Sequence, residues 1–462
     1  MSSQIVDINP ALAQAETYNE KPVDGQQEFA DDEEKKMHPN PPRQDAFGDE
    51  EFAEVKYKVL KWWQCGLLMV AETISLGILA LPAAVAGLGL APSIIILFGM
   101  GALASYTGFV IGQFKARYPH ITGMADAGEV LMGGFGRELL GVGQMLLLVF
   151  LMASHVLTFT TALNTLTEHG TCSLVFGVVS MVLSCILSLP RTLVKMSWLS
   201  LVSFISIVAA VLITMIGLGV QNDRIPVHAT VDTNLVTAFT SAANIILSFA
   251  SHNTFFTFAA ELKNPNDFPK ALAVLQSIDI SLYAIAAIVI YCYTGQNVES
   301  PALGSASSLI SKIAYGIALP TIVIAGVING HVAAKAVYLR IFAGTSRVHK
   351  RDLIAVSSWI GISVGLWVIA WIIASAIPVF NNLLSLITAL FCSWFTFGLP
   401  SMFWLYMNNG LWFASPRKIC LTLLNVFTIG IAAVLCGLGL YTSGKAIHDD
   451  PSSESFSCAN NA

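Results

Sequence analysis

The sequence predicts an all-α, polytopic membrane protein, and three observations support that fold class. Of the 462 residues, 55% are hydrophobic and 11% are charged, whereas an ordinary soluble domain has about 25% charged residues. Apolar runs of roughly 18 residues or more, the length that crosses about 30 Å of hydrocarbon, recur along the chain. The alternating short strands of a membrane β-barrel are not found in it.

The first 55 residues differ from the rest of the chain. They hold fourteen Asp or Glu against four Lys or Arg, a net charge of −10. Such a segment cannot bury enough apolar surface to offset its ordering entropy, so residues 1–55 are expected to be a disordered acidic tail. The tail has no apolar signal-peptide core, which predicts that it stays in the cytoplasm. Its Lys35 and Lys36 are either regulatory sites for the ubiquitin machinery or part of a solvated run of charged residues.

Eleven apolar runs follow, and they define a membrane domain over residues 56–445. The predicted spans cover residues 63–90, 92–114, 138–166, 172–190, 197–220, 234–260, 271–294, 309–342, 354–378, 380–406 and 418–442. Several of them are longer than the hydrocarbon requires, so tilted or kinked helices are expected. A short C-terminal tail, residues 446–462, follows the last span.

Basic residues predict the orientation of these spans. With the acidic tail inside, the cytoplasmic segments receive Lys56, Lys58, Lys61, Lys115, Arg117, Arg137, Arg191, Lys195, Lys263, Lys270, Arg347, Lys350, Arg351, Arg417 and Lys418. The opposite side receives Arg224, Lys312 and Lys445. This asymmetry predicts a cytoplasmic N-terminus, and the odd number of spans then places the C-terminal tail outside. There, Cys172 and Cys458 either form a disulfide in an oxidising compartment or remain two thiols.

Span 6 carries polar residues in its middle, where they are most costly. The stretch IILSFASHNTFF, residues 245–256, contains Ser248, Ser251, His252 and Asn253. Every backbone amide in hydrocarbon needs an internal partner, so a broken helix persists only where it lines a cavity or a binding site. Freed amides at one half-helix end attract an anion, and freed carbonyls at the other attract a cation. A zwitterionic amino acid offers both charges.

Span 1 has a matching stretch, AETISLGILALPAA. Its Thr73, Ser75 and Gly77 are poor or middling helix residues, and Pro82 removes an amide donor. Spans 1 and 6 each open a set of five spans, and interrupted helices at corresponding positions indicate a transporter built from inverted repeats. The alternative is a pair of ordinary Gly and Pro kinks, which are common in membrane helices.

Several motifs, in the same order along the chain, resemble one family. AETISLGILALP, YPHITGMADAGEVLMGGFGRE and SFASHNTFFTFAAELKNPNDFPKAL are similar to the amino acid/auxin permeases. GTCSLVFGVVS, SPAL followed by KIAYGIALP, and FSCA resemble the fungal neutral amino acid permeases within that family. The resemblance covers roughly residues 55–460. It implies eleven spans in a leucine-transporter-like 5+5 inverted repeat with broken helices 1 and 6, and proton-driven uptake of amino acids.

The resemblance places the substrate at the two interruptions. The candidate substrate-binding residues are Ser75, Leu76, Gly77, Phe249, Ala250, Ser251 and His252. The first three would offer backbone amides to the substrate carboxylate, and the carbonyls of residues 249–251 would meet its ammonium. Aromatic side chains at the second interruption would either wall the pocket or pack against neighbouring spans.

Ionisable residues within spans are costly and are therefore functional candidates. They are Glu72, His155, His252, Glu261, Asp279, His331 and Lys335. Glu72, His252 and Lys335 are the candidates for proton coupling, and each has an alternative role. Glu72 could form a structural ion pair, and the His252 ring could hydrogen-bond the loosened backbone. Lys335 could snorkel to the membrane interface. Glu261 is expected to form a cap or gate pair, and His155 an interhelical hydrogen bond.

The predicted function is a secondary active importer of neutral aliphatic or aromatic amino acids, coupled to protons, in the plasma membrane. Its partners would be the substrate, the proton and the lipid bilayer. An enzyme, a nucleic-acid binder, a resident cofactor and a metal site are not expected, because no phosphate-binding glycine loop or metal-ligand spacing occurs. A sensor or transceptor, a transporter of the vacuolar membrane, and coupling to sodium are the alternatives that the sequence leaves open.

Overall fold

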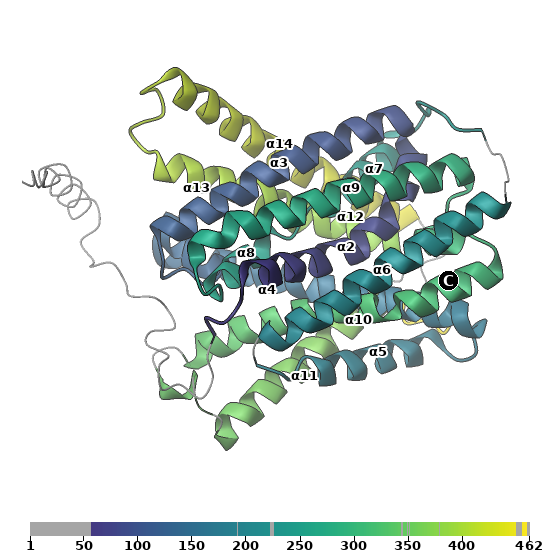
Figure 1. Cartoon of the computed structure of the whole chain (residues 1–462), viewed down its shortest axis with the longest axis horizontal. Helices are drawn as coiled ribbons and strands as arrows, with labels where there is room; N and C mark the ends of the chain where they lie inside the picture. Colours follow the sequence, from purple (N-terminus) through teal and green to yellow (C-terminus); the bar gives the residue numbers. More distant parts are fainter. Residues whose placement is uncertain are drawn as a thin grey trace, which may run out of the picture. The chain divides into compact units, whose positions relative to one another are not determined.

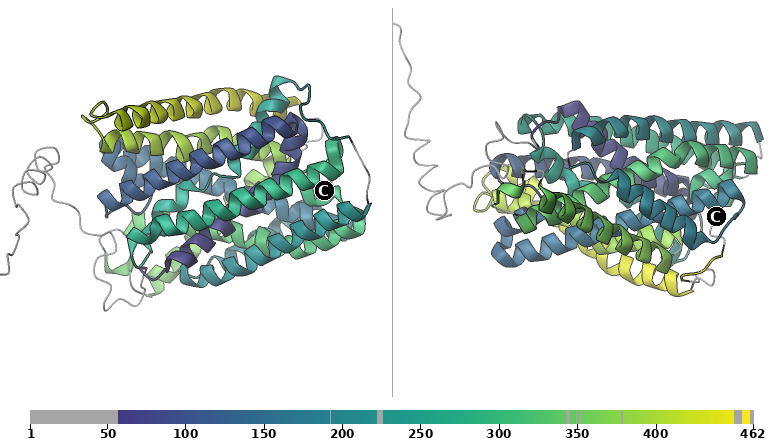
Figure 2. Two further views of the ribbon diagram at one scale, coloured as in Figure 1. Left: turned by 45° about the horizontal axis from the view of Figure 1, so that its top comes forward. Right: turned by 90° about the horizontal axis from the view of Figure 1, so that it is seen from below.

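Long apolar helices make up most of the part of the chain that the structure covers (Figure 1). The structure is a computed structural model that describes residues 57–191, 193–221, 226–342, 345–348, 350, 352–377, 379–449 and 455–459. The acidic tail of residues 1–55, with Lys35 and Lys36, lies outside the described residues. Figure 2 shows in two further views that the long helices run side by side.

The helices appear in the predicted order and number. The first five spans are α2 (Trp62–Leu88), α3 (Leu90–Arg117), α4 (Met124–Thr167), α5 (Ser173–Leu187) and α6 (Leu193–Gln221). The next five are α7 (Leu235–Leu247) with α8 (His252–Ala260), α9 (Phe268–Thr294), α10 (Ser308–Phe342), α11 (Leu353–Ala376), and α12 (Phe380–Ile387) with η5 (Thr388–Gly398) and α13 (Leu399–Met407). The last is α14 (Pro416–Asp449). Within the described ranges, ten spans are long and apolar enough to cross a membrane, and α5 is a shorter apolar helix of 15 residues.

Short connections and one change of winding separate these helices. The connections include the 3-10 turns η1 (Pro265–Asp267), η2 (Gly295–Asn297), η3 (Ala302–Ser305) and η4 (Ser346–Val348). In span 10 the segment η5 is a π-helix of 11 residues between two α-helical ends. Span 3 starts earlier than predicted, because α4 includes a kink at Gly133, which has a φ of 64°. A glycine adopts that left-handed conformation at little cost.

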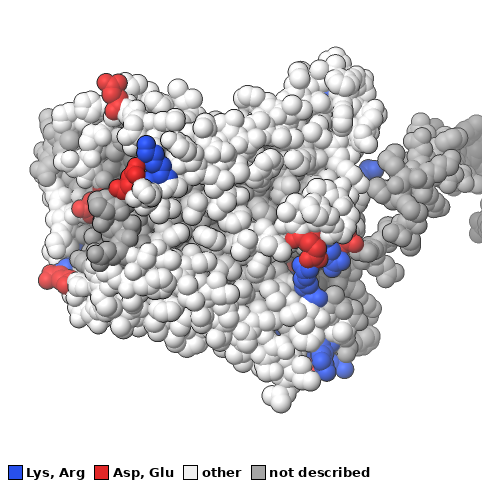
Figure 3. Space-filling view, turned by 180° about the vertical axis from the view of Figure 1, so that it is seen from behind, with Lys and Arg blue, Asp and Glu red and all other residues white. Residues whose placement is uncertain are grey.

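The helix α2 lies at the centre of the membrane domain. It packs against α6, α7, α9 and α10. In its most apolar 18-residue stretch 94% of the residues are buried, whereas in that of α14 28% are buried. The outer helices instead expose apolar side chains such as Ile205, Ile216 and Phe427. Figure 3 shows, on one side of the molecule, charged side chains at two ends and a wide uncharged belt between them. This distribution suits a bundle that is embedded in lipid.

The two ends of the bundle differ in their charged groups. We call the end at which α2 begins the basic face; its basic residues are Lys58, Lys61, Lys115, Arg117, Arg137, Arg191, Lys263, Lys270, Arg340, Arg347, Lys350, Arg417 and Lys418. The opposite end is the disulfide face, where a bond joins Cys172 to Cys458. There Lys312 hydrogen-bonds Glu168, and this contact lowers the pKa of the Glu168 carboxyl.

The disulfide attaches the C-terminal segment to two helices of the disulfide face. Ser173 Oγ at the start of α5 donates to the carbonyl of Ala459 at 2.6 Å. The Phe456 amide donates to the carbonyl of Ser375 near the end of α11 at 2.9 Å. The bond spans 286 residues of sequence, so it closes a long loop in the unfolded chain.

Loss of this disulfide is expected to lower stability. A Cys172→Ser variant should lose about 2–5 kcal/mol of stability, since cross-links that close long loops restrict the unfolded chain most. The thermal midpoint of purified protein measures this, with Cys292→Ser, which removes an exposed free thiol, as the matched control. A digest without reductant should contain the Cys172 and Cys458 peptides joined. Two separate peptides in that digest would contradict the pairing.

Candidate substrate-binding site

Span 6 is interrupted where the polar residues predicted it. The helix α7 ends at Leu247 and α8 begins at His252, so four residues of irregular backbone lie between them. The amides of Phe249 and Ala250 bond carbonyls three residues back, at 3.1 and 2.9 Å, instead of continuing the α-helical ladder. The interruption is enclosed: Ser248, Phe249 and Ser251 are each at most 1% exposed.

A small cavity lies beside this interruption, in the middle of the bundle. It has a volume of about 20 Å³ and is lined by Glu72, Thr73, Leu76, Gly77, Leu151, His155, Leu247, Ala250, Ser251 and Asn329. These residues come from α2, α4, α7, the interruption and α10. Pockets for small ligands typically enclose about 300 Å³ or more. In this conformation the cavity therefore has no room for a small-molecule ligand.

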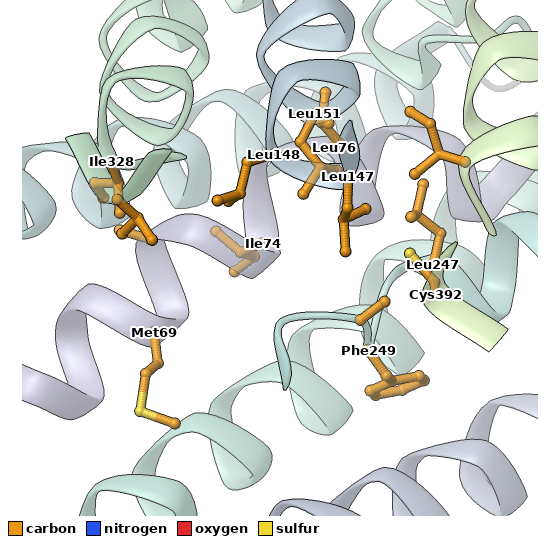
Figure 4. Packing of buried hydrophobic residues seen from close by; sticks show 14 of the residues in the cluster. Met69, Ile74, Leu76, Leu147, Leu148, Leu151, Leu247, Phe249, Ile328 and Cys392 are labelled. Carbon is orange, nitrogen blue, oxygen red and sulfur yellow. The ribbon is translucent and has the colours of Figure 1, made fainter. Parts of the chain in front are cut away.

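Apolar side chains form one part of the cavity wall. Leu76 of α2, Leu151 of α4 and Leu247 of α7 line it. Figure 4 shows Leu76 and Leu151 close together, with Phe249 lying apart from them. The other part of the wall is polar and includes Glu72, Thr73 and Ser251.

Glu72 is the acidic residue of the cavity wall. Its side chain is 6% exposed, and its Oε2 lies 2.8 Å from Thr254 Oγ1 of α8. That hydroxyl also lies 2.8 Å from the carbonyl oxygen of Ser251. The contact therefore joins α2 to the half-helix α8 directly beside the interruption.

The candidate residues of the interruption divide into two groups. Ala250 and Ser251 line the cavity. Phe249 instead packs its ring 5.4 Å from that of Tyr283 on α9. His252 faces α3, where its Nε2 is 2.9 Å from the carbonyl oxygen of Ala104. Neither Phe249 nor His252 lines the cavity, because irregular backbone turns successive side chains in directions that helical periodicity does not predict.

Span 1 differs from the expected pattern. The helix α2 runs from Trp62 to Leu88 without a break, and Leu76 and Gly77 line the cavity whereas Ser75 does not. A continuous α-helix uses its interior amides for its own hydrogen bonds, so the expected carboxylate site at residues 75–77 is not open in this conformation. The interruption was expected from the low helix propensities of these residues. Intrinsic propensity has little influence where packing on every side of the helix stabilises it.

Lys335 lies outside the cavity, toward the basic face. It is 2% exposed and forms an ion pair with Glu261, which is fully buried at the end of α8. Its ammonium also lies 4.5 Å from the centre of the Tyr57 ring. The prediction that Lys335 snorkels to the membrane interface is therefore wrong. The buried Glu261 carboxylate holds its ammonium inside the protein. Glu261 forms an ion pair, as expected, although with Lys335 rather than a neighbour in sequence.

Two further polar residues line the cavity: Asn329 was not named from the sequence, and His155 was a candidate whose expected role was an interhelical hydrogen bond. Asn329 of α10 lines the cavity and is 1% exposed, and its Oδ1 has no hydrogen-bond partner in the described chain. His155 of α4 also lines it, and its Nδ1 likewise has none there. The sequence offered a signal for each, since both are polar residues inside an apolar span. Which face of the span they occupy could not be read, because those spans are apolar all around.

Comparisons with solved structures agree with this architecture. A Na⁺-coupled sialic acid symporter, solved in a substrate-bound outward-open state, aligns with a TM-score of 0.54 over 86% of this chain and 92% of its own, at 13% identity. MhsT in complex with L-phenylalanine aligns with a TM-score of 0.54 over 85% of this chain and 99% of its own, at 11% identity. Together with the helix count, these likenesses confirm the leucine-transporter-like fold class.

Comparisons of sequence identify the family. An "N amino acid transport system protein" of Neurospora crassa is 35% identical over 419 residues, which are 87% of this chain and 89% of that protein. A "transmembrane transporter" of Gibberella moniliformis is 31% identical over 76% of each chain. The family model for transmembrane amino acid transporter proteins matches residues 58–443. The chain therefore belongs to the transmembrane amino acid transporter family, the amino acid/auxin permeases.

Proposed function

We propose that this transporter imports neutral aliphatic or aromatic amino acids by proton symport with alternating access. The observation that carries the proposal is the cavity beside the broken span 6. One part of its wall is polar, with Glu72 and Ser251, and another is apolar, with Leu76, Leu151 and Leu247. Among the residues that the structure describes, no lysine or arginine lines it. An amino acid with an uncharged side chain matches this division, because its charged backbone groups and its side chain can face different parts of the wall.

The backbone at the interruption is our candidate for the substrate ammonium. Ala250 and Ser251 line the cavity, and Glu72 adds a negative group next to them. For the substrate carboxylate we retain the backbone of residues 75–77. In our proposal α2 opens locally there when the site widens, because the amides must leave their helical partners to bind an anion.

Glu72 is our candidate for proton coupling. It lines the cavity and contacts α8, so its protonation can respond both to the substrate and to movement of the half-helix. His252 and Lys335 were candidates as well, but they face α3 and Glu261 respectively. Coupling to sodium is the competing possibility, and the same uptake measurement distinguishes the two ions.

We further propose that the basic face is cytoplasmic and that the protein lies in the plasma membrane. The excess of Lys and Arg on the basic face supports the orientation, and the disulfide between Cys172 and Cys458 suits an oxidising outer compartment. Residues 1–55 would then be a cytoplasmic tail, with Lys35 and Lys36 available to the ubiquitin machinery. The alternatives are a vacuolar location and an amino acid sensor.

Uptake of labelled neutral amino acids tests the function. In cells that lack their own permeases, we expect concentrative uptake that is larger at pH 5 than at pH 7.5 and collapses with a protonophore. A Glu72→Gln variant should lose this accumulation, because the amide cannot bind and release the proton. Glu168→Gln, at an exposed carboxyl on the disulfide face, is the matched control.

Other outcomes of this assay separate the alternatives. Uptake that requires sodium and ignores the protonophore would contradict proton coupling. Binding without uptake, by protein at the cell surface, would favour the sensor. A protein confined to an internal membrane would contradict the plasma-membrane assignment, and uptake would then be measured in vesicles from that membrane.

A further inference from the structure

A stripe of buried polar side chains runs along one face of α9. Gln276, Asp279 and Tyr283 follow one another at helical spacing, and they are 6%, 1% and 0% exposed. In the described chain, Gln276 Oε1, Asp279 Oδ1 and the Tyr283 hydroxyl have no hydrogen-bond partner. A buried polar atom without a partner is destabilising, because it has lost its hydrogen bonds to water and gained none in return. Three such atoms on one stripe indicate a site that binds something, rather than a packing surface.

The stripe faces α2 beside the substrate cavity. The helices α2 and α9 make the most extensive contact in the bundle. At Gly77 the two elements meet closely, because a Cβ at that position would lie 2.9 Å from both the Tyr283 hydroxyl and Ser248 Cα. Closer to the start of α2, a Cβ on Gly66 would lie 3.2 Å from the carbonyl oxygen of Ala271. These two approaches align α9 with α2, so Asp279 lies level with the stretch of α2 that contains Glu72.

Other charged groups on the elements around α9 are engaged elsewhere. On α3, Lys115 donates to the carbonyls of Pro119 and Ile121 at 2.6 Å. The described side chains of α6, residues 196–221, include no titratable group. In span 6, the His252 ring faces α3. On α2, the ionisable groups within the helix are Glu72 and the thiol of Cys65. Among the described residues, neither of these two buried carboxyl groups forms an ion pair with a cationic side chain.

Two charged carboxylates cannot share such a region at low cost. Burying one charge without a partner costs several kcal/mol, and a second like charge nearby adds to that cost. The surroundings of Glu72 accommodate either protonation state. The Thr254 hydroxyl can donate a hydrogen bond to an ionised Glu72 at Oε2, or it can donate to the Ser251 carbonyl and accept a hydrogen bond from a protonated Glu72.

We propose that Asp279 and Glu72 form one proton-binding pair, in which Glu72 faces the substrate and Asp279 holds the proton when Glu72 is ionised. In this step the proton leaves the Glu72 carboxyl and binds the Asp279 carboxylate, so the pair keeps a net charge of −1. The substrate ammonium then meets an ionised Glu72, while the proton stays with the pair. In the proposed step the Tyr283 hydroxyl turns to donate a hydrogen bond to the Asp279 carboxyl, a bond that it does not make in the described conformation. The inference rests on the proposed proton symport.

Purified transporter in liposomes tests the pair. Two measurements are compared: accumulation of a neutral amino acid driven by a gradient of about two pH units, and exchange of labelled for unlabelled substrate at equal pH. With one proton per substrate, that gradient supports accumulation of up to about 100-fold, since each pH unit is worth tenfold. We expect the Asp279→Asn transporter to equalise the substrate concentrations inside and outside the liposomes without accumulating substrate. It should still exchange labelled for unlabelled substrate.

The matched control is Asp267→Asn, which makes the same change at a partly exposed ion pair with Lys270 just before α9; it should accumulate like the wild type. Accumulation by Asp279→Asn at the wild-type level would overturn the pair. So would loss of exchange in a folded Asp279→Asn protein, because that result assigns Asp279 to packing or substrate binding. A wild type that ignores the proton gradient would instead contradict the proposed function, before any variant is compared.

A second variant decides the question if Asp279→Asn does not fold. Asp279→Glu keeps the carboxyl group and moves it by one methylene. We expect it to accumulate substrate with a pH dependence displaced from that of the wild type. An unchanged pH dependence would overturn the proposal, because a proton-binding group cannot be moved within a dry interface without a change in its proton affinity.

Discussion

Replacement of Lys335 by methionine is expected to destabilise the protein by about 3–5 kcal/mol, because removing one partner of a buried ion pair leaves an uncompensated charge. Lys335 and Glu261 are 2% and 0% exposed, and they pair across the contact between α10 and the end of α8. Thermal unfolding in detergent measures the loss. The matched control is Lys270→Met, which removes an exposed ammonium from its pair with Asp267 and should cost about 1 kcal/mol or less.

The double variant Lys335→Met with Glu261→Met separates charge from packing. Replacing both partners of a buried pair with apolar residues is often neutral or stabilising, so most of the lost stability should return. If the double variant is as unstable as Lys335→Met alone, the carboxylate is not the cause, and the loss comes from the contact between the Lys335 ammonium and the Tyr57 ring.

The surroundings of this pair suggest why a charged pair is kept there. Next to Glu261, residues Leu60 and Leu262 form an isolated parallel bridge, with Leu60 N donating to the Glu261 carbonyl at 3.0 Å and Lys263 N to the Leu60 carbonyl at 2.9 Å. The chain before α2, the end of α8 and α10 are thereby joined at the basic face. The bridge thus holds the end of span 6 in the position where the Glu261 carboxylate meets Lys335.

Substitution of Gly77 by valine is expected to reduce uptake to background. A Cβ at this position would lie 2.9 Å from Ser248 Cα and from the Tyr283 hydroxyl, so α2 would have to move away from both the interruption and α9. Overpacking of this kind costs about 1–3 kcal/mol in stability. The effect on transport should be larger, because the displaced residues line or adjoin the cavity. Uptake at equal surface expression measures the result.

Gly99→Val is the matched control for this substitution. Gly99 lies on α3, and a Cβ there would have no heavy atom within 4 Å, so the variant should transport like the wild type. Gly77→Ala, which adds the Cβ alone, should fall between the two. Normal uptake by Gly77→Val would mean that α2 and span 6 are not held together during transport, and the proposed site would then be in the wrong place.

Features that depend on neighbours in sequence could be predicted without the structure. The eleven spans follow from hydropathy, since a helix must be apolar over its own length to lie in lipid. The interruption of span 6 follows from the four polar residues within the stretch from Ser248 to Asn253, because polar groups in hydrocarbon need a cavity or a partner. The approximate position of the site, between spans 1 and 6, follows from the same stretches.

Features that depend on contacts between distant residues could not be predicted. Nothing local indicates that Lys335 meets Glu261, 74 residues away, or that Asp279 lies opposite Glu72. The same limit applies to α2, which resembles a broken helix by its residues and remains continuous because neighbouring helices cover nearly all of it.

The sequence by itself thus determined the helix count, the family resemblance and the location of the break. The tertiary structure decided which side chains face the cavity: Glu72, His155 and Asn329 do, whereas Phe249, His252 and Lys335 do not. The physical reason is that spans buried among other spans are apolar on every face. Their sequences carry no amphipathic pattern that shows which side looks inward, so only packing against the neighbouring helices sets that direction.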